Sequence, residues 1–291
     1  MQPVSEIIQK QNDANNEKYL KSKHCQSNCD KCMAAGACGI WEKPAYYDGK
    51  YLVAATKVFC SKRNDCEKLS SYRSEWIEKN KKNSGLKDLL NKRINDFVAS
   101  DPWQEAIKKM AVNYIADCKN NFAEHMPCNW LMFLGQSGCG KTHLCSGISN
   151  WLLEQNKRVL YVRYIELSNS ISNFDYSLLE RAKHAQILYL DDLFKSSTNR
   201  LDDKAIFDLI DYRYNNNMQT IISCERTSQE MIDINEAVVG RIVEKCNGFF
   251  FEIEKEPGKN YRLNCWHEKY MEYTRMIFLL VLEQKMNVHR F

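Results

Sequence analysis

Residues 135–142 read Gly-Gln-Ser-Gly-Cys-Gly-Lys-Thr and fit the pattern G-x-x-x-x-G-K followed by Ser or Thr. The apolar residues 131–134 before them predict a strand, and the apolar periodicity of residues 144–153 after them predicts a helix. A phosphate-binding loop requires this strand-loop-helix context, in which small residues let backbone N–H groups surround phosphates at a helix N-terminus. The segment therefore predicts a nucleotide site rather than a chance match in a turn.

The loop residues have separable expected roles. Lys141 is expected to place its charge against the β- and γ-phosphates of ATP, and Thr142 to offer its hydroxyl to Mg²⁺. Cys139 is expected to act as a small filler. The residues predicted to contact the nucleotide are Gly135, Gln136, Ser137, Gly138, Cys139, Gly140, Lys141, Thr142 and His143.

A second element of the site follows at residues 187–192, Ile-Leu-Tyr-Leu-Asp-Asp, an apolar strand that ends in two carboxylates. Asp191 at the strand end is expected to orient Mg²⁺, and Asp192 to polarise the attacking water. A solvated carboxylate without a catalytic role is the alternative for Asp192. The predicted catalytic set so far is Lys141, Asp191 and Asp192.

The order of predicted elements indicates the fold class. Apolar runs at 130–134, 158–164, 187–190, 220–223 and 249–253 alternate with helical patterns. This alternation is typical of a three-layer α/β/α fold with a mainly parallel sheet. Asp101 and Pro102 predict the start of an amphipathic helix, since Pro is favoured at the first helical position.

Six of the 13 cysteines fall between positions 25 and 66. In a reducing compartment such a cluster more often holds metal than disulfides, and four thiolates suit a structural Zn²⁺ site. We expect a small N-terminal zinc module with a hairpin within residues 46–59; free cysteines in a small apolar core are the alternative. The predicted ligands are Cys29, Cys32, Cys60 and Cys66, with Cys25, Cys38 and His24 as substitutes.

Charge and composition suggest how the chain divides. The net charge is +4 and 44% of the residues are hydrophobic, which excludes intrinsic disorder and fibrous repeats. Residues 67–93 hold eight basic and four acidic side chains, and residues 78–85 read as a helix end followed by a linker. We predict a zinc module and basic linker at 1–84, an ATPase domain at 85–265 and a C-terminal tail at 266–291 that is a candidate helix.

The sequence also bears on location. The longest apolar run, residues 276–282, is far shorter than the roughly 20 residues needed to cross a bilayer. Residues 1–6 lack the basic start and apolar stretch of a secretory signal. We expect a cytoplasmic protein without membrane contact.

Residues from about 85 to 265 resemble the AAA+ domain of DnaC/DnaI-type bacterial and phage helicase loaders, with IstB-like ATP-binding proteins as near relatives. The resemblance rests on the phosphate loop, on Leu-Asp-Asp-Leu at 190–193, on Asp-Tyr-Arg-Tyr-Asn-Asn at 211–216, on Thr-Ile-Ile-Ser at 220–223 and on Glu-Ala-Val-Val-Gly-Arg-Ile at 236–242. It implies an AAA+ P-loop fold without a lid, and slow, partner-dependent hydrolysis of ATP to ADP and phosphate.

The resemblance also implies roles for single residues. Arg241 matches the arginine finger that completes a neighbouring subunit's site, so it joins the predicted catalytic set; a surface arginine on a helix is the alternative. Glu225 stands where the family usually has an Asn that senses the γ-phosphate. A carboxylate there would repel phosphate unless it is protonated or turned toward Arg226, so Ser223 is expected nearer the nucleotide. Arg213 is expected in a salt bridge or an interface.

The function that the resemblance implies is ATP-dependent loading of a hexameric replicative DNA helicase onto single-stranded DNA at replication initiation. The zinc module would contact the helicase, and the chain would form a homo-oligomer on it. Phe174 and Tyr176 are expected either to stack on bases or to pin a loop to the core, and the basic run at 79–93 either binds DNA phosphates or is a solvated helix. The alternatives are an IstB-like ATPase that assists a transposase on duplex DNA and a non-hydrolysing adaptor.

Overall fold

The structure is a computed structural model that describes residues 40–43, 46–47, 52–53, 56–59, 67–124, 126–195, 200–256 and 258–263. The six clustered cysteines, His24 and the segment 266–291 lie outside these residues, as do the predictions made for them. Among the described helices, none combines the length and apolarity needed to cross a membrane.

The N-terminal part of the described chain contains two antiparallel strand pairs followed by a helix. β1 (Ile40–Lys43) pairs with β4 (Thr56–Phe59), and β2 (Tyr46–Tyr47) pairs with β3 (Leu52–Val53). The hairpin expected within residues 46–59 is therefore confirmed by the β2–β3 pair. The helix that follows, α2, covers Glu67–Asn83.

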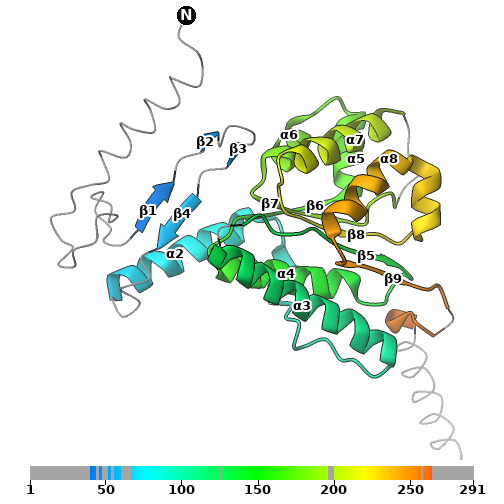
Figure 1. The fold of residues 1–291 in the computed structure, drawn as a ribbon, viewed down its shortest axis with the longest axis horizontal. Coiled ribbons are helices and arrows are strands. Elements are labelled where there is room, and N and C mark those ends of the chain that lie inside the picture. The colour runs from blue at the N-terminus through cyan, green and yellow to red at the C-terminus, as the bar shows by residue number, and fades with distance from the viewer. Residues whose placement is uncertain are drawn as a thin grey trace, which may run out of the picture.

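The centre of the molecule is a parallel sheet of five strands in the order β6-β7-β8-β5-β9 (Figure 1). The strands are β5 (Leu131–Gly135), β6 (Val159–Arg163), β7 (Ile187–Asp191), β8 (Thr220–Ser223) and β9 (Phe250–Ile253). All five predicted strands are confirmed, with shifts of one residue at some ends. Because the strands are parallel, their carboxyl ends meet at one edge, and the phosphate loop leaves the sheet at that edge.

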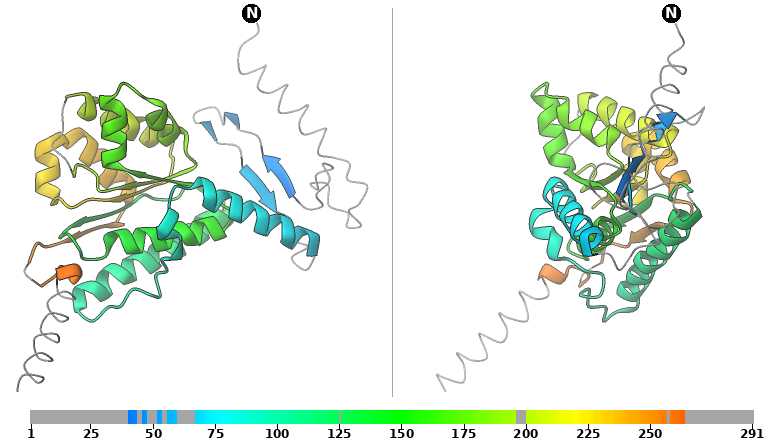
Figure 2. Two further views of the ribbon diagram at one scale, coloured as in Figure 1. Left: turned by 180° about the vertical axis from the view of Figure 1, so that it is seen from behind. Right: turned by 90° about the vertical axis from the view of Figure 1, so that its left-hand side faces the viewer.

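Helices cover both faces of the sheet, which gives the predicted three layers (Figure 2). α3 (Pro102–Glu124) and α4 (Lys141–Glu154) pack on one face. α5 (Tyr164–Ser172), α6 (Ser177–His184), α7 (Arg200–Asn215) and α8 (Ser228–Cys246) pack on the other. The expected start of α3 at Pro102 is confirmed.

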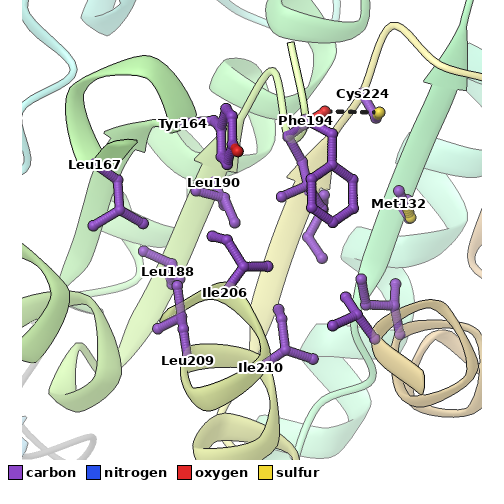
Figure 3. Close-up of a cluster of buried hydrophobic side chains, with 14 of the residues drawn as sticks. Met132, Tyr164, Leu167, Leu188, Leu190, Phe194, Ile206, Leu209, Ile210 and Cys224 are labelled. Atoms are coloured by element: carbon purple, nitrogen blue, oxygen red, sulfur yellow. Dashed lines mark hydrogen bonds between the residues drawn. The ribbon is translucent and has the colours of Figure 1, made fainter. Parts of the chain in front are cut away.

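The apolar core explains why the strands are so hydrophobic. Every residue of β5 is buried, because a central parallel strand is covered on both faces. Met132 and Leu134 join the core beneath α5–α8, while Leu131 and Phe133 join the core beneath α3 and α4. Figure 3 shows the first of these cores, where side chains of β7 meet those of α7. Each fully buried Leu or Phe contributes about 1.5–3 kcal/mol.

α2 ends at Asn83, within the segment 78–85 where the sequence predicts a helix end, and the residues after it pack on the following domain. The backbone N–H of Tyr161 on β6 donates to the Ser84 carbonyl at 2.7 Å, and Leu86 is 1% exposed. A short 3₁₀ helix, η2 (Lys87–Asn91), follows, and Asn150 Nδ2 on α4 donates to the carbonyls of Leu89 and Lys92 at 2.8 and 2.9 Å. Apolar burial overrides the polar composition here, so this segment is part of the ATPase domain surface.

Arg213 also differs from expectation. It is fully buried on α7 and hydrogen-bonds to five neutral oxygens, instead of forming a salt bridge or lying at an interface. These oxygens belong to the side chain of Thr220 and to the main chain of Gln219, Ala182, Lys183 and Ala185. Arg213 thereby ties the end of α6 to the start of β8.

Beyond β9 the described chain contains one helical turn at residues 261–263. Residues 264–291 lie outside the described part, so the absence of a lid stays a prediction. So does the domain boundary near residue 85.

Candidate nucleotide-binding site

A cavity of about 410 Å³ lies at the carboxyl edge of the sheet, beside the phosphate loop. Three groups of residues line it: part of the segment 89–104, loop and helix residues 138–143, and Asp192, Lys195, Glu225, Tyr261 and Arg262. The sequence motifs predicted the second group and Asp192. Lys195 follows Asp192 by three residues, Glu225 is the residue at the expected sensor position, and the others come from segments 89–104 and 261–262.

The phosphate loop needs glycine at two of its positions for steric reasons. Gly135 and Gly140 have φ angles of 97° and 92°, in the left-handed region that other residues avoid. A Cβ on Gly135 would lie 1.9 Å from the Ile253 carbonyl oxygen, and one on Gly140 would lie 2.4 Å from the Phe97 ring. Phe97 thus packs directly on the loop, which holds the segment before α3 against the cavity.

Lys141 begins α4 and is only 5% exposed. Its Nζ donates to the carbonyls of Gly135 and Gln136 at 2.9 and 2.6 Å, so the ammonium group is held inside the loop. Cys139 is buried, its Sγ lies 2.8 Å from the Gln136 carbonyl, and burial raises the pKa of its thiol. A neutral, packed thiol fits the expected role of filler.

Asp191 is 4% exposed, and its hydrogen-bond donors among the described residues are hydroxyl groups. Thr142 Oγ1 and Tyr189 Oη lie 3.2 and 2.7 Å from its Oδ1, and Tyr161 Oη lies 2.9 Å from its Oδ2. The Ser223 hydroxyl is a fourth donor, to Oδ1. Four bonds approach the acceptor capacity of a carboxylate, so this charge can remain buried without a cation.

The two tyrosines of this shell are donors that the sequence motifs did not reveal. Burial, together with the charge of Asp191, raises the pKa of Tyr161 and of Tyr189, so both phenols stay protonated. A signal was present: Tyr189 precedes Asp191 by two residues and shares its side of the strand, and Tyr161 pairs with Tyr189 in register.

The donor set at this point fits Mg²⁺. The Thr142 hydroxyl and the Asp191 carboxylate meet at 3.2 Å, and both are hard oxygen ligands. A bound ion would complete its shell with phosphate oxygens and water. In the part of the chain that the structure describes, no three His, Cys, Asp or Glu residues gather as a metal cluster.

Asp192 and Glu225 both pair with a lysine that lines the cavity. Lys195 Nζ lies 2.8 Å from Asp192 Oδ2 and 3.3 Å from Glu225 Oε1. Burial raises the pKa of Asp192 above its ordinary value, although the bond from Lys195 opposes this effect. For Glu225, burial is outweighed by the hydrogen bond from Ser137 and the charge of Lys195, so its pKa lies below its ordinary value.

In the structure, Glu225 is not paired with Arg226, the partner that the sequence suggested. Ser137 Oγ in the phosphate loop donates to Glu225 Oε1 at 2.8 Å. Arg226 instead donates from Nε to the Phe194 carbonyl at 2.7 Å. Ser223 does not line the cavity; its hydroxyl lies behind Asp191 and also accepts from the Asp192 N–H at 3.0 Å.

Two other predicted contacts lie at different distances from the site. His143 lines the cavity, with its Nε2 2.8 Å from the Arg93 carbonyl oxygen. Arg241 lies on α8, outside the cavity lining, where its Nε is 2.9 Å from Asp211 Oδ1 and its guanidinium group stacks over the Phe207 ring. The Arg241 of one chain therefore does not reach that chain's own nucleotide site.

The loop after α5 carries the aromatic residues considered for base stacking. Phe174 and Tyr176 are 74% and 43% exposed. The alternative that Phe174 pins this loop to the core is therefore wrong.

Comparison with known proteins shows which family the chain resembles in this region. Residues 93–246 match the profile described as the bacterial DnaA ATPase domain. The chain is 31% identical to the protein YqaM of Bacillus subtilis (strain 168) over 196 residues, which cover 63% of this chain and 62% of YqaM. It is 32% identical to the phage-like element PBSX protein XkdC of the same organism, over 55% of this chain and 60% of XkdC.

Replication proteins are among the further matches. The chromosomal replication initiator protein DnaA of Onion yellows phytoplasma (strain OY-M) is 26% identical over 55% of this chain and 34% of its own length. The solved structure of the DnaC helicase loader is 19% identical, covers 58% of this chain and 99% of its own, and superposes with a TM-score of 0.48.

The matched region spans about three fifths of the first two relatives. The DnaA profile, in contrast, covers more than half of the present chain and includes the phosphate loop, Asp191, Asp192 and Arg241. The protein belongs to the family of bacterial DnaA ATPase domains.

Proposed function

We propose that this protein is an ATP-dependent loader that places a hexameric replicative DNA helicase on single-stranded DNA. The observation that carries the proposal is a nucleotide site in which Lys141, Thr142 and Asp191 converge while Arg241 lies on the α7–α8 surface. A site whose predicted arginine finger, Arg241, lies elsewhere on the same chain suits a switch that responds to assembly, because hydrolysis waits for a neighbouring copy.

The proposed reaction is attack of water on the terminal phosphate, which gives ADP and inorganic phosphate. Lys141 and the loop N–H groups bind the phosphates, and Thr142 and Asp191 would hold Mg²⁺, which would supply positive charge to them when bound. Asp192 orients the water and accepts its proton. Arg241 from a neighbouring copy neutralises charge in the transition state, for which it must leave Asp211.

Single-stranded DNA is the proposed nucleic acid partner. The exposed rings of Phe174 and Tyr176 offer two surfaces on which bases can stack, each worth about 1–3 kcal/mol. Along α2, Lys79 and Lys82 are exposed and available to phosphates. Replacing Phe174 with Ala is expected to weaken binding of single-stranded DNA about tenfold while nucleotide binding is kept.

The N-terminal cysteines are proposed to hold one structural Zn²⁺ and to dock on the helicase. Metal analysis of the purified full chain should then find about one zinc per chain. Substitution of Cys29 with Ser should lower this content, whereas Cys224→Ser in the ATPase core should leave it unchanged.

The test of the loader is light scattering of the full chain mixed with the replicative helicase of its host, with ATP and with ADP. A complex of several copies on one hexamer, with single-stranded DNA stimulating turnover, is the expected result. No complex in either state, together with stimulation by duplex DNA, would favour the IstB-like alternative. Turnover equal to that of Lys141→Ala in every mixture would favour the adaptor.

The finger role of Arg241 has a separate test. Arg241→Ala should retain ATP affinity but lose turnover about 10³-fold in the assembled complex, since fingers contribute about 10³–10⁵. Turnover that persists in the complex would leave Arg241 as a surface residue paired with Asp211.

A further inference from the structure

The short turn after β7 holds a lysine beside the phosphate loop. Asp192 and Phe194 have φ angles of 57° and 59°, so the chain reverses sharply, and the N–H of Lys195 donates to the Asp192 carbonyl at 3.0 Å. Two left-handed residues in one turn are costly and persist only where other contacts fix them. The backbone of Lys195 is therefore set by its surroundings.

Those fixing contacts come from the end of β8. The N–H of Leu193 donates to the Ser223 carbonyl at 2.9 Å, and the Leu193 carbonyl accepts from Cys224 Sγ, the dashed line in Figure 3. The Phe194 carbonyl accepts from Arg226, and its ring is 1% exposed in the core. The turn is thus held by several contacts, while the Lys195 side chain is 45% exposed and lines the cavity.

The charges around Lys195 are poorly suited to a polyphosphate unless the lysine compensates them. Asp192 and Glu225 both line the nucleotide cavity, and Glu225 is bonded to Ser137 in the phosphate loop itself. One ammonium group bridges the two carboxylates. An ammonium has three donors, so it can keep one carboxylate and still bind a further anion.

We propose that Lys195 distinguishes a triphosphate from a diphosphate by exchanging its ion pair with Asp192 for one with the terminal phosphate. When the phosphate end of the cavity carries the charge of a diphosphate only, Lys195 stays between Asp192 and Glu225 and keeps Asp192 occupied. With a triphosphate it leaves Asp192, which then becomes available to water. Glu225 keeps the lysine nearby and takes the place of the neutral sensor residue that this position usually carries. This inference rests on the proposed function.

A plain surface ion pair is the competing explanation. Such pairs contribute little and would affect ATP and ADP equally. Lys255 provides the matched control: its Nζ lies 2.7 Å from Glu230, its side chain is 43% exposed, and it lies outside the cavity lining.

The experiment is calorimetric titration of the full chain with Mg-ATP and with Mg-ADP, read as the ratio of the two affinities. Lys195→Met is expected to weaken ATP binding about tenfold or more, which is the usual scale of one charge-assisted hydrogen bond, and to change ADP binding less than about twofold. Lys195→Arg should restore the preference. Glu225→Gln should strengthen ATP binding, and Glu225→Gln combined with Lys195→Met should lose less than Lys195→Met alone.

Melting curves without nucleotide identify any variant that fails to fold, in which case Lys195→Gln replaces Lys195→Met. An ATP to ADP ratio that is unchanged in the folded Lys195 variant, or changed equally in Lys255→Met, would overturn the proposal while leaving the nucleotide site intact. Wild-type protein that binds neither nucleotide would instead overturn the proposed function, and this inference with it.

Discussion

The two ends of the parallel sheet both bury a charge without an opposite charge beside it. At the carboxyl end, Asp191 accepts hydrogen bonds from four hydroxyl groups. At the amino end, Arg213 donates to five neutral oxygens. Dipoles can replace a counter-ion when they use the full bonding capacity of the charged group.

The two ends differ in where the groups that bond to the buried charge lie. The oxygens around Arg213 belong to the ends of helices and strands, so that cation holds the fold together. The donors around Asp191 include Thr142, which lines the nucleotide cavity. One buried charge is therefore structural, while the other is available to a ligand.

The largest expected effect would break the structural end. Arg213→Met leaves carbonyl groups of α6 and of the approach to β8 without donors, and should lower the free energy of unfolding by about 3–5 kcal/mol, measured by urea denaturation. Arg241→Met removes an arginine from a half-exposed pair and should cost less than about 1 kcal/mol. Equal losses in the two variants would contradict the structural role of Arg213.

The next effect concerns the functional end. Lys141→Ala should reduce ATP affinity about 100-fold or more, since the lysine charge is expected against the phosphates, while the free energy of unfolding falls by only about 1–3 kcal/mol because two loop carbonyls lose their donor. Nucleotide titration and urea denaturation of the same sample measure both values. Affinity within a few-fold of wild type would remove the phosphate loop from the proposed site.

The tyrosines of the Asp191 shell should show a smaller effect on stability. Tyr189→Phe and Tyr161→Phe each remove one hydroxyl donor from a buried carboxylate, at a cost of about 1–2 kcal/mol. Tyr189 is fully buried and Tyr161 is not, so the first substitution should cost more. Tyr214→Phe on α7 is the control, since this hydroxyl bonds to the exposed Glu244 and not to a buried carboxylate, and a pair of neutral results at Tyr161 and Tyr189 would show that Asp191 does not depend on these donors.

The smallest expected effect concerns a charged residue at the surface, Glu230, as a contrast to the two buried charges. The hydrogen bond from Lys255, aided by the Thr227 N–H, lowers the pKa of Glu230 to about 2, against an ordinary value of 4.5. Its contribution is present above pH 4.5 and is lost as the pH falls toward 2. Because Glu230 is 43% exposed, Glu230→Gln should cost less than about 1 kcal/mol at pH 7 and flatten the acid dependence of stability in this window. An unchanged acid slope would show that this pair contributes nothing.

Sequence patterns predicted the parts of this molecule that depend on near neighbours. The strand before Gly135, the glycines of the loop and the strand ending at Asp191 follow from local periodicity and spacing. The donors Tyr161 and Ser223 and the pairing of Glu225 with Lys195 depend on which strands are adjacent, and the sequence pattern does not state this. Glu225 illustrates the point, since the adjacent Arg226 points to Phe194 while a lysine thirty residues away provides the charge.

The contacts of segment 84–97 could not be predicted from the sequence for a related reason. Its composition is polar and basic, but Leu86 and Phe97 are buried against the ATPase domain and outweigh it. Composition averages over a window, whereas packing depends on a few apolar side chains at the right positions.

Tyr161 connects the segment after α2 to the Asp191 carboxylate through two hydrogen bonds. Its backbone N–H holds the carbonyl of Ser84 directly after α2, and its phenol holds the Asp191 carboxylate. We therefore expect a displacement of α2 to move Asp191, the predicted magnesium ligand, through Tyr161. A displacement of Asp191 is expected to act on the segment after α2 through the same residue. By thermodynamic linkage, a partner that binds at α2 and changes the affinity of the Asp191 site for its ligand would have its own affinity changed by the same factor.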